Sequence, residues 1–200
     1  MHEVAGHRVF NPAYNRFLDW PGRAGWQKPD EVIRALALRE GAVVADVGAG
    51  SGYFTGRFAR AVGPTGRVLA TDVQPEMIRA LEKRARDEAL ANVSVVEAAF
   101  DDPALPAACC DLVFLANVYK EISDRPAYLL RVAPALRPGG RLAVIDFRPG
   151  VSGFGPPAEV RLPEEQVVAE AAAAGFVLVE QHELLERQYF LVFAPGAEGP

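Results

Sequence analysis

The chain has 200 residues, half of them hydrophobic, which is enough for the core of one domain but hardly for two. Its net charge of −5 argues against a nucleic-acid substrate, whose phosphates require a basic surface. No apolar run approaches the roughly 18 residues that cross a membrane, and no basic-then-apolar leader is visible. We therefore expect a cytoplasmic protein that neither spans a membrane nor is exported.

Residues 1–29 show no regular hydrophobic period and are rich in aromatic residues, Gly and Pro. That aromatic content is not typical of a flexible tail. The segment either caps the front of the predicted sheet or packs against the outside of the first helix. We treat it as an N-terminal cap segment, followed by a main domain over residues 30–195 and a frayed tail over residues 196–200.

The first helix is predicted to begin at Pro29, because proline suits the first turn and the acids that follow it favour the positive end of the helix dipole. Gly41 marks its end. Residues 43–47 are then short, apolar and β-branched, which is typical of a strand buried on both faces of a parallel sheet.

A glycine loop follows that strand. Gly48, Gly50 and Gly52 let the backbone turn tightly and approach a ligand, because no Cβ intervenes. The spacing is G-x-G-x-G, and Tyr53 stands where the dinucleotide-binding fingerprint requires glycine. The loop therefore indicates a ligand site of another type.

Two acids lie at the ends of neighbouring predicted strands. Asp46 is at the carboxyl end of the first strand, where it would repel a phosphate but attract a cation. Asp72 closes the second strand, over residues 67–71, at a place where a carboxylate can accept both hydroxyls of a ribose. Together they predict a site for a positively charged nucleoside.

Helices and strands alternate through the rest of the chain. We predict helices over 52–62, 75–89, from Ser123 or Asp124 to 136, and 163–174, and strands over 93–96, 111–116, 142–146, 176–179 and 189–193. The last two strands are close enough in sequence to form an antiparallel pair. The Gly- and Pro-rich stretch over 147–162 is too long for an ordinary connection and is predicted to be a substrate lid.

At the strand–loop–helix of residues 43–55 and at Asp72, the chain resembles the class I S-adenosylmethionine-dependent methyltransferases, in particular bacterial enzymes that act on small molecules. The Leu-Arg-Pro-Gly-Gly turn at residues 136–140 is similar to a turn of the same family. The resemblance covers residues 26–194. It implies a Rossmann-like, three-layer α/β sandwich with a seven-stranded, mostly parallel sheet whose last strand is reversed.

The resemblance also implies the cofactor, S-adenosyl-L-methionine, and its product, S-adenosyl-L-homocysteine. In the family, the glycine loop lines the methionine part, the first acid anchors its amino end, and the second acid holds the ribose. The residues implied in cofactor binding are Asp46, Gly48, Ala49, Gly50, Gly52, Asp72, Val73, Phe100 and Asn117. Arg23 or Lys28 is a candidate for the cofactor carboxylate or an acidic substrate, with a solvated surface charge as the alternative.

One part of the family pattern is missing. Relatives often carry a Gly-Asp pair after the third strand, and its acid binds the adenine amino group. Ala98 and Ala99 stand there in this chain. The adenine contact then passes to the backbone near Phe100 or to Asp101, and the ring of Phe100 is a candidate for stacking on the adenine.

Residues 117–122 fall beside the cofactor sulfur in this family. They resemble the Asn-x-x-His-His element of small-molecule methyltransferases, with Lys120 and Glu121 in place of the histidines. They do not match the Asn/Asp-Pro-Pro-aromatic motif of enzymes that methylate nucleic-acid bases. We therefore expect a small-molecule substrate, no nucleic-acid partner, and a monomer or homodimer.

Methyl transfer from a sulfonium needs mainly orientation, and it needs a base only if the acceptor is a weak nucleophile. Tyr119 and Lys120 are the first catalytic candidates, and each is alternatively structural or solvent-facing. The other candidates are Glu121, Tyr14 and His7. No metal site is predicted, because the histidines are isolated and the only cysteines, at 109 and 110, lack ligand-spaced partners.

Two rival functions remain. The missing Gly-Asp pair and the absence of an evident base motivate a non-catalytic S-adenosylmethionine-binding or interaction module. An NAD-dependent oxidoreductase is disfavoured by Tyr53.

Overall fold

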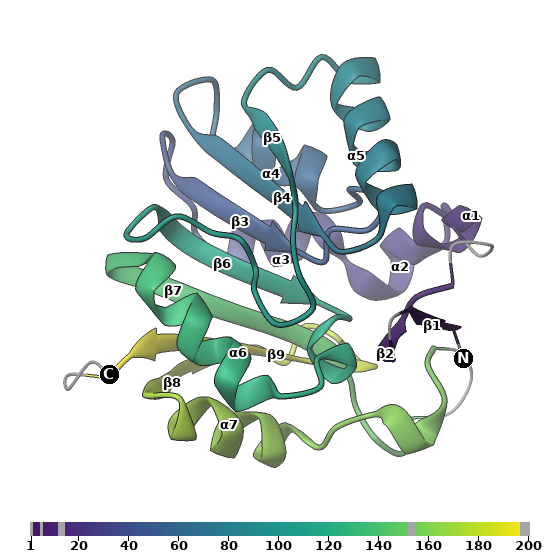
Figure 1. Cartoon of the computed structure of the whole chain (residues 1–200), viewed down its shortest axis with the longest axis vertical. Coiled ribbons are helices and arrows are strands. Elements are labelled where there is room, and N and C mark those ends of the chain that lie inside the picture. Colours follow the sequence, from purple (N-terminus) through teal and green to yellow (C-terminus); the bar gives the residue numbers. More distant parts are fainter. Residues whose placement is uncertain (1, 5, 12–14, 152–154, 197–200) are drawn as a thin grey trace.

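A computed structural model describes the protein over residues 2–4, 6–11, 15–151 and 155–196. Its centre is a seven-stranded sheet with the strand order β5-β4-β3-β6-β7-β9-β8 (Figure 1). The strands are β3 (Val43–Val47), β4 (Arg67–Asp72), β5 (Val93–Glu97), β6 (Cys110–Ala116), β7 (Leu136–Phe147), β8 (Phe176–Gln181) and β9 (Gln188–Pro195). The pairs from β5 to β7 are parallel, whereas β9 runs antiparallel to β7 and β8. The predicted reversed last strand is confirmed.

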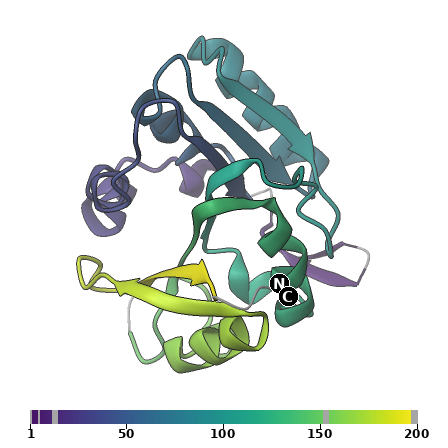
Figure 2. The same cartoon turned by 90° about the vertical axis from the view of Figure 1, so that its left-hand side faces the viewer.

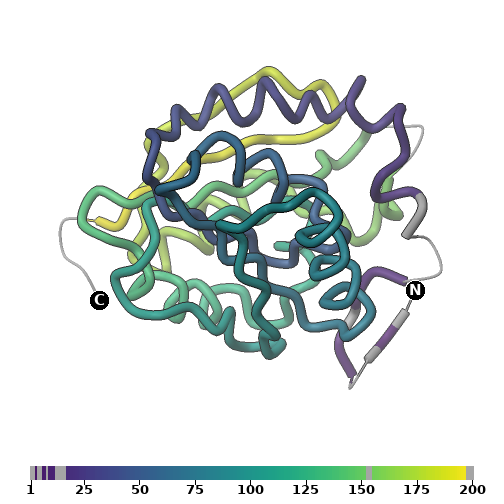
Figure 3. The backbone as a smooth tube through the Cα atoms, turned by 90° about the horizontal axis from the view of Figure 1, so that it is seen from above, coloured from purple at the N-terminus to yellow at the C-terminus, as the bar shows by residue number. Residues whose placement is uncertain are grey.

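Helices cover both faces of this sheet, as the three-layer prediction required. They are α3 (Pro29–Ala35), α4 (Thr55–Ala61), α5 (Pro75–Asp87), α6 (Arg125–Val132) and α7 (Glu164–Ala173). Helices α3 and α4 pack on one face and α6 and α7 on the other, while α5 packs against β4 and β5. Figure 2 shows α7 beside the C-terminal strand pair, and Figure 3 shows α2 (Arg23–Gln27) leading directly into α3.

The central strands are apolar on both faces because both faces are covered. In β6, Leu112 and Phe114 pack with α3 and α4, whereas Val113 and Leu115 pack with α6 and α7. All four side chains are fully buried. This is the reason that these strands show continuous apolar runs rather than alternation.

Two predicted element starts shift by three residues or more, and the choice left open for the cap of α6 is decided. Helix α4 begins at Thr55 rather than at residue 52, because the glycine loop extends through Phe54. Strand β7 begins at Leu136, so the Leu-Arg-Pro-Gly-Gly turn lies within the strand beside a register irregularity in its pairing with β6. Of the two predicted caps of α6, Asp124 is the one used: its Oδ1 accepts the N–H of Ala127 at 3.1 Å.

The N-terminal segment has structure of its own. Strands β1 (His2–Val4) and β2 (His7–Val9) form a separate two-stranded sheet, followed by the short helices α1 (Asn15–Leu18) and α2. Strand β2 contacts the 3₁₀ turn η2 (Tyr119–Glu121) that follows β6. The segment therefore lies at the end of the large sheet where β3 and β6 finish (Figure 1).

Candidate functional site

A cavity of about 770 Å³ lies where β3, β4, β6 and β7 reach their carboxyl ends. This is the edge at which open α/β sheets bind ligands, and the volume is in the usual range for a small-molecule site. The loops after these strands form its inner wall. The N-terminal segment supplies Val9, Phe10, Asn11, Phe17, Leu18, Arg23 and Trp26.

The loop after β3 forms one side of the cavity through Gly48, Ala49 and Gly50. Gly48 has a φ of 63°, a conformation that favours glycine. A Cβ at this position would lie 2.4 Å from Cγ2 of Val118. Backbone conformation and space therefore both require glycine at position 48.

Gly52 has a different role from the one predicted. It is not part of the cavity lining, and a Cβ there would lie 3.0 Å from side-chain atoms of Leu81 and Arg84 on α5. Its carbonyl accepts a hydrogen bond from Arg84 at 3.1 Å. The assignment of Gly52 to ligand contact is corrected: the missing side chain lets α5 approach the loop.

Asp72, the last residue of β4, is hydrogen-bonded to the loop that follows β3. Its Oδ2 accepts the N–H of Gly50 at 2.9 Å, and its Oδ1 accepts the N–H of Gln74 at 3.0 Å. Burial raises the pKa of this carboxyl, although hydrogen bonds from the backbone of Gln74, Gly50 and Val73 oppose the rise. The carboxylate therefore holds the glycine loop and lines the cavity at the same time.

Asp46 lies beside it, 3% exposed, and its Oδ2 accepts the hydroxyl of Thr55 at 2.6 Å. Burial raises the pKa of Asp46 from 3.8 to about 7. The Thr55 hydroxyl and the charge of Arg23 lower this pKa, whereas the charge of Asp72 raises it. A cation entering the cavity would stabilise the ionised form of both acids.

Several polar atoms around this loop have no hydrogen-bond partner in the described part of the chain. They are Ser51 Oγ, Tyr53 OH, Thr71 Oγ1 and Gln74 Oε1, and all four residues line the cavity. Buried polar atoms are normally satisfied in native proteins. These orphaned atoms therefore fit a polar ligand lying along the glycine loop.

Arg23 reaches the same end of the cavity from α2. Its Nε donates to Gln27 Oε1 at 2.5 Å, its NH1 donates to the carbonyl of Leu18 at 2.5 Å, and its guanidinium lies 3.9 Å from the centroid of the Tyr53 ring. Burial lowers the pKa of Arg23 to about 10, opposed by the charges of Tyr53, Asp19 and Asp46. The group remains a cation at neutral pH. Lys28, the other candidate, is not part of the cavity lining.

A chain of side-chain amides connects α2 to the far side of the cavity. Gln27 Nε2 donates to Gln188 Oε1 at 3.1 Å, and Gln188 Nε2 donates to Asn117 Oδ1 at 2.6 Å. Both glutamines are fully buried. Asn117 lines the cavity with its backbone in a left-handed conformation, φ 65°. The two glutamines carry no sequence motif and were not predicted.

Tyr119 does not face the cavity, so its assignment as a catalytic candidate is corrected. It is fully buried on the α6–α7 side of the sheet, and its hydroxyl donates to Glu170 Oε2 at 3.0 Å. Arg125 holds the same carboxylate with two hydrogen bonds of 2.7 and 2.8 Å. Burial and the charge of Glu170 raise the pKa of Tyr119.

We expect Tyr119→Phe to lower the free energy of unfolding by about 1 kcal/mol, because one buried hydrogen bond is lost. Tyr189→Phe is the matched control: Tyr189 is equally buried, but its hydroxyl has no hydrogen-bond partner in the described ranges. Its removal should leave stability unchanged or raise it. Urea unfolding of both variants measures this, and equal losses for the two would contradict the assignment.

Lys120 and Glu121, the next two residues of η2, both line the cavity. The Lys120 ammonium pairs with Asp146 Oδ1 at 3.4 Å and Glu121 Oε1 at 3.8 Å. It also donates a short hydrogen bond to the carbonyl of Asn117. The other base candidates lie elsewhere: His7 hydrogen-bonds Ser123 at 3.1 Å outside the lining, and Tyr14 falls outside the described residues.

Phe100 lines the cavity, as do Val73, Ala98 and Ala99. The ring of Phe100 is stacked on that of His7 with centroids 4.1 Å apart and planes 5° apart. Asp101 is not part of the lining, and its carboxylate pairs with Arg131 at 3.2 Å. Of the candidates near the adenine, the cavity thus includes Phe100 and leaves out Asp101.

The predicted lid also reaches the cavity. Gly155, Pro156, Pro157 and Val160 line it, and the latter part of the stretch includes the 3₁₀ turn η4 (Ala158–Val160). Residues 152–154 fall outside the described residues.

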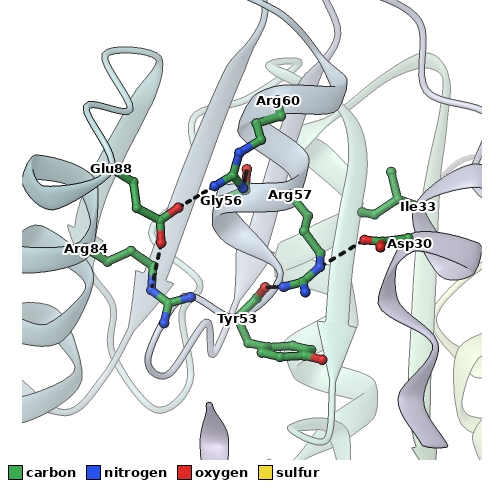
Figure 4. Close-up of a pocket in the computed structure, with 8 residues that line it drawn as sticks. All are labelled: Asp30, Ile33, Tyr53, Gly56, Arg57, Arg60, Arg84 and Glu88. Atoms are coloured by element: carbon green, nitrogen blue, oxygen red, sulfur yellow. Dashed lines mark hydrogen bonds and ion pairs between the residues drawn. The ribbon is translucent and has the colours of Figure 1, made fainter. Parts of the chain in front are cut away.

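A second cavity of about 480 Å³ lies between α3, α4 and α5 (Figure 4). Three arginines line it, and each is paired with a carboxylate. The pairs are Arg57 with Asp30 at 3.1 Å, Arg60 with Glu88 at 2.7 Å and Arg84 with Asp19 at 2.6 Å. The positive charge of this cavity is therefore already balanced.

The described ranges contain no cluster of three or more His, Cys, Asp or Glu side chains that could hold a metal ion. Among the same residues, none of the helices has the length and apolarity needed to cross a bilayer.

Comparison with known proteins gives consistent matches. The family model described as "Methyltransferase domain" matches residues 44–140. The ubiquinone/menaquinone biosynthesis C-methyltransferase UbiE of Pasteurella multocida is 32% identical over 147 residues, which are 73% of this chain and 53% of that protein. The UbiE of Psychromonas ingrahamii is 33% identical over 116 residues, 58% of this chain and 46% of that protein. The chain thus spans about half the length of these curated relatives.

A solved structure matches more completely. The crystal structure of a SAM-dependent methyltransferase from Aquifex aeolicus has a TM-score of 0.89 and 29% sequence identity, covering 92% of this chain and 98% of that one. Its fold and length both agree with those of this protein. With the family match over the glycine loop and Asp72, these likenesses make the chain similar to the class I S-adenosylmethionine-dependent methyltransferases, in sequence over residues 44–140 and in fold over nearly its whole length.

Proposed function

We propose that the protein transfers the methyl group of S-adenosylmethionine to a small molecule bound in the same cavity. The observation that carries this proposal is the pair of buried carboxylates, Asp46 and Asp72, which line the cavity together with the glycine loop between β3 and α4. When bound, S-adenosylmethionine supplies an electrophilic methyl group on a positively charged sulfur. The residues of the chain then bind and orient the two reactants.

The polar end of the cavity suits the cofactor. Asp46 would hold its amino group, Arg23 its carboxylate and Asp72 its ribose hydroxyls, each by a charge-assisted hydrogen bond. Gly48, Ala49 and Gly50 would follow the methionine part. The unsatisfied oxygens of the cavity wall, such as Ser51 Oγ, support this fit because a polar ligand would supply their missing partners.

The adenine would lie between Val73 and Phe100. The stacking of His7 on one face of Phe100 supports this, because it fixes the orientation of the phenylalanine ring. Asn117 would lie near the reacting sulfur, with its amide held by Gln188. In this arrangement, residues 1–29 serve as a cap on the main domain of residues 30–195.

The acceptor would occupy the apolar part of the cavity, beside the aromatic rings of Phe10, Trp26 and Phe147 and under the 147–162 lid. These rings favour a planar molecule. The names of the relatives, which are quinone-biosynthesis C-methyltransferases, support a ring acceptor methylated on carbon. They also favour an enzyme over a non-catalytic module. We further propose a cytoplasmic monomer or homodimer that does not act on nucleic acid.

Two measurements test this function. Calorimetry should give one S-adenosylmethionine site per chain. Incubation of the protein with a cell extract and S-adenosylmethionine carrying a deuterated methyl group should produce a metabolite with one labelled methyl, detected by mass spectrometry. Absence of binding would reject the proposal. Binding without any labelled product would favour the non-catalytic module.

We expect Gly48→Ala to weaken S-adenosylhomocysteine binding at least about tenfold. The new Cβ would displace Val118, which also lines the cavity, and alanine is strained at a positive φ. Gly139→Ala is a matched control, because Gly139 also has a positive φ but its Cβ would meet no atom within 4 Å. Calorimetry on both variants separates the free-energy cost of backbone strain from that of the clash with Val118. Equal S-adenosylhomocysteine affinities of the two variants would contradict the close contact between position 48 and Val118.

A further inference from the structure

The turn η2 places two charged side chains in a wall that is otherwise largely apolar. Lys120 is only 6% exposed at its side chain, and Asp146, at the end of β7, is 2% exposed. Glu121 is 30% exposed at its side chain and lines the cavity next to Lys120. Burying charges is costly unless they are paired, and the proposed holding of the cofactor does not use these three residues.

The ammonium of Lys120 is bound by protein groups on the side that faces away from the open cavity. It donates to the carbonyl of Asn117 and pairs with Asp146 at 3.4 Å. Its distance of 3.8 Å to Glu121 is an ion-pair distance and too long for a hydrogen bond. An ammonium has three protons to donate. One of them is thus available for a ligand oxygen placed between Lys120 and Glu121.

Asp146 is fixed in position. Its Oδ1 accepts the N–H of Phe147 at 2.8 Å, and its Oδ2 accepts the N–H of Lys120 at 3.4 Å. These bonds hold the carboxylate behind the ammonium, away from the open cavity. Asp146 is therefore a positioning residue for Lys120, and Glu121 is the carboxylate that a ligand can reach.

Glu121 is well suited to accept a proton. One cation, Lys120, faces two anions, Asp146 and Glu121, and Asp72 adds a further negative charge. Burial raises the pKa of Glu121, and the charges of Asp146 and Asp72 raise it too, whereas Lys120 and a hydrogen bond from the backbone of Phe10 lower it. A proton on Glu121 removes the excess of negative charge around Lys120.

We propose that Glu121 accepts the proton of an acidic hydroxyl group, a phenol or an enol, on the methyl acceptor, and that Lys120 holds the resulting oxyanion. The proposal rests on the function proposed above. The O–H bond breaks, its electron pair stays on oxygen, and the proton moves to a Glu121 oxygen. One proton leaves the acceptor for each methyl gained, and Glu121 releases it to solvent. Ionisation activates the oxygen and the ring carbons conjugated with it.

The first experiment tests the oxyanion site without turnover. We use 2-naphthol, a planar phenol whose neutral and ionised forms differ in absorbance, with the protein saturated with S-adenosylhomocysteine. A pH titration of the bound probe should show its acid ionisation constant raised about tenfold to a thousandfold by Lys120. Lys120→Met should abolish this increase.

The second experiment tests the proton acceptor. Calorimetry of 2-naphthol binding in two buffers of different ionisation enthalpy gives the number of protons released. For the unmodified protein we expect almost none, because the proton stays on Glu121. Glu121→Gln keeps the Lys120–Asp146 pair, so it should bind the naphtholate and release about one proton per probe. Glu165→Gln, an exposed carboxylate on α7, is the control and should behave as the unmodified protein.

Each result of these experiments either supports or overturns the proposal. The oxyanion site is rejected if 2-naphthol does not bind or if it stays neutral when bound. It is also rejected if 2-naphthol ionises equally in Lys120→Met and in the unmodified protein. Glu121→Gln with no proton release overturns the role of Glu121. S-adenosylhomocysteine affinity is measured first for every variant, so loss of folding is recognised. If the unmodified protein fails to bind S-adenosylhomocysteine, the proposed function fails as well, and the two failures are distinguishable.

Discussion

Asp72→Ala is expected to weaken S-adenosylhomocysteine binding about a hundredfold. Two hydrogen bonds from ribose hydroxyls to a carboxylate are worth roughly 3 kcal/mol together, and each 1.4 kcal/mol is a factor of ten in affinity. The substitution also frees the N–H groups of Gly50 and Gln74, which the carboxylate now holds at 2.9 and 3.0 Å. The glycine loop would then lose its link to β4.

Calorimetry measures this loss. Asp87→Ala is a suitable control, because Asp87 is an exposed acid at the end of α5 whose pair with Lys83 lies on the surface. Surface pairs of this kind contribute little, so the control should bind as the unmodified protein. An Asp72→Ala affinity within threefold of the control's would show that this carboxylate does not hold the ribose.

Asp46→Asn is expected to remove most of the pH dependence of stability that this acid causes in the ligand-free protein. The pKa of Asp46 is about 7 in the fold, above its ordinary value of 3.8. Folding therefore favours the neutral carboxyl, and the stability from this group is fully present below about pH 4. It is lost as the pH rises toward and through 7, by up to about 4 kcal/mol at 1.36 kcal/mol per unit of pKa.

Urea unfolding at pH 4.5 and pH 8 measures the effect. The unmodified protein should lose stability over this interval, and Asp46→Asn should lose less. A cationic ligand favours the ionised form of Asp46 instead of the neutral form, because it lowers the pKa of this carboxyl. S-adenosylmethionine should therefore bind more tightly as the pH rises through 7 and should release a proton on binding. Identical pH profiles for the two proteins would contradict the buried, high-pKa acid.

The parts that the sequence predicted well are local in sequence. The strand over residues 43–47 is recognisable because burial on both faces demands a continuous apolar run. The glycine loop and Asp72 follow two strand ends, and parallel strands bring their carboxyl ends to one edge. The whole order of the sheet and its reversed strand came from the family resemblance rather than from any single segment.

The failures concern side-chain direction. Tyr119 and Lys120 are adjacent in sequence. In the 3₁₀ turn, however, the Tyr119 side chain lies on the α6–α7 side of the sheet and bonds Glu170, whereas Lys120 lines the cavity. Nothing in the residue types distinguishes these two outcomes. Gln27 and Gln188 were missed for another reason: they are single polar residues 161 positions apart, and only the folded chain brings them together.

That pairing also sets an order of events during synthesis. The amide of Gln27 is synthesised 161 residues before its partner, Gln188, which lies on β9. A buried amide without a partner is costly. We therefore expect α2 to reach its final position only after Gln188, 161 residues further along the chain, has been translated.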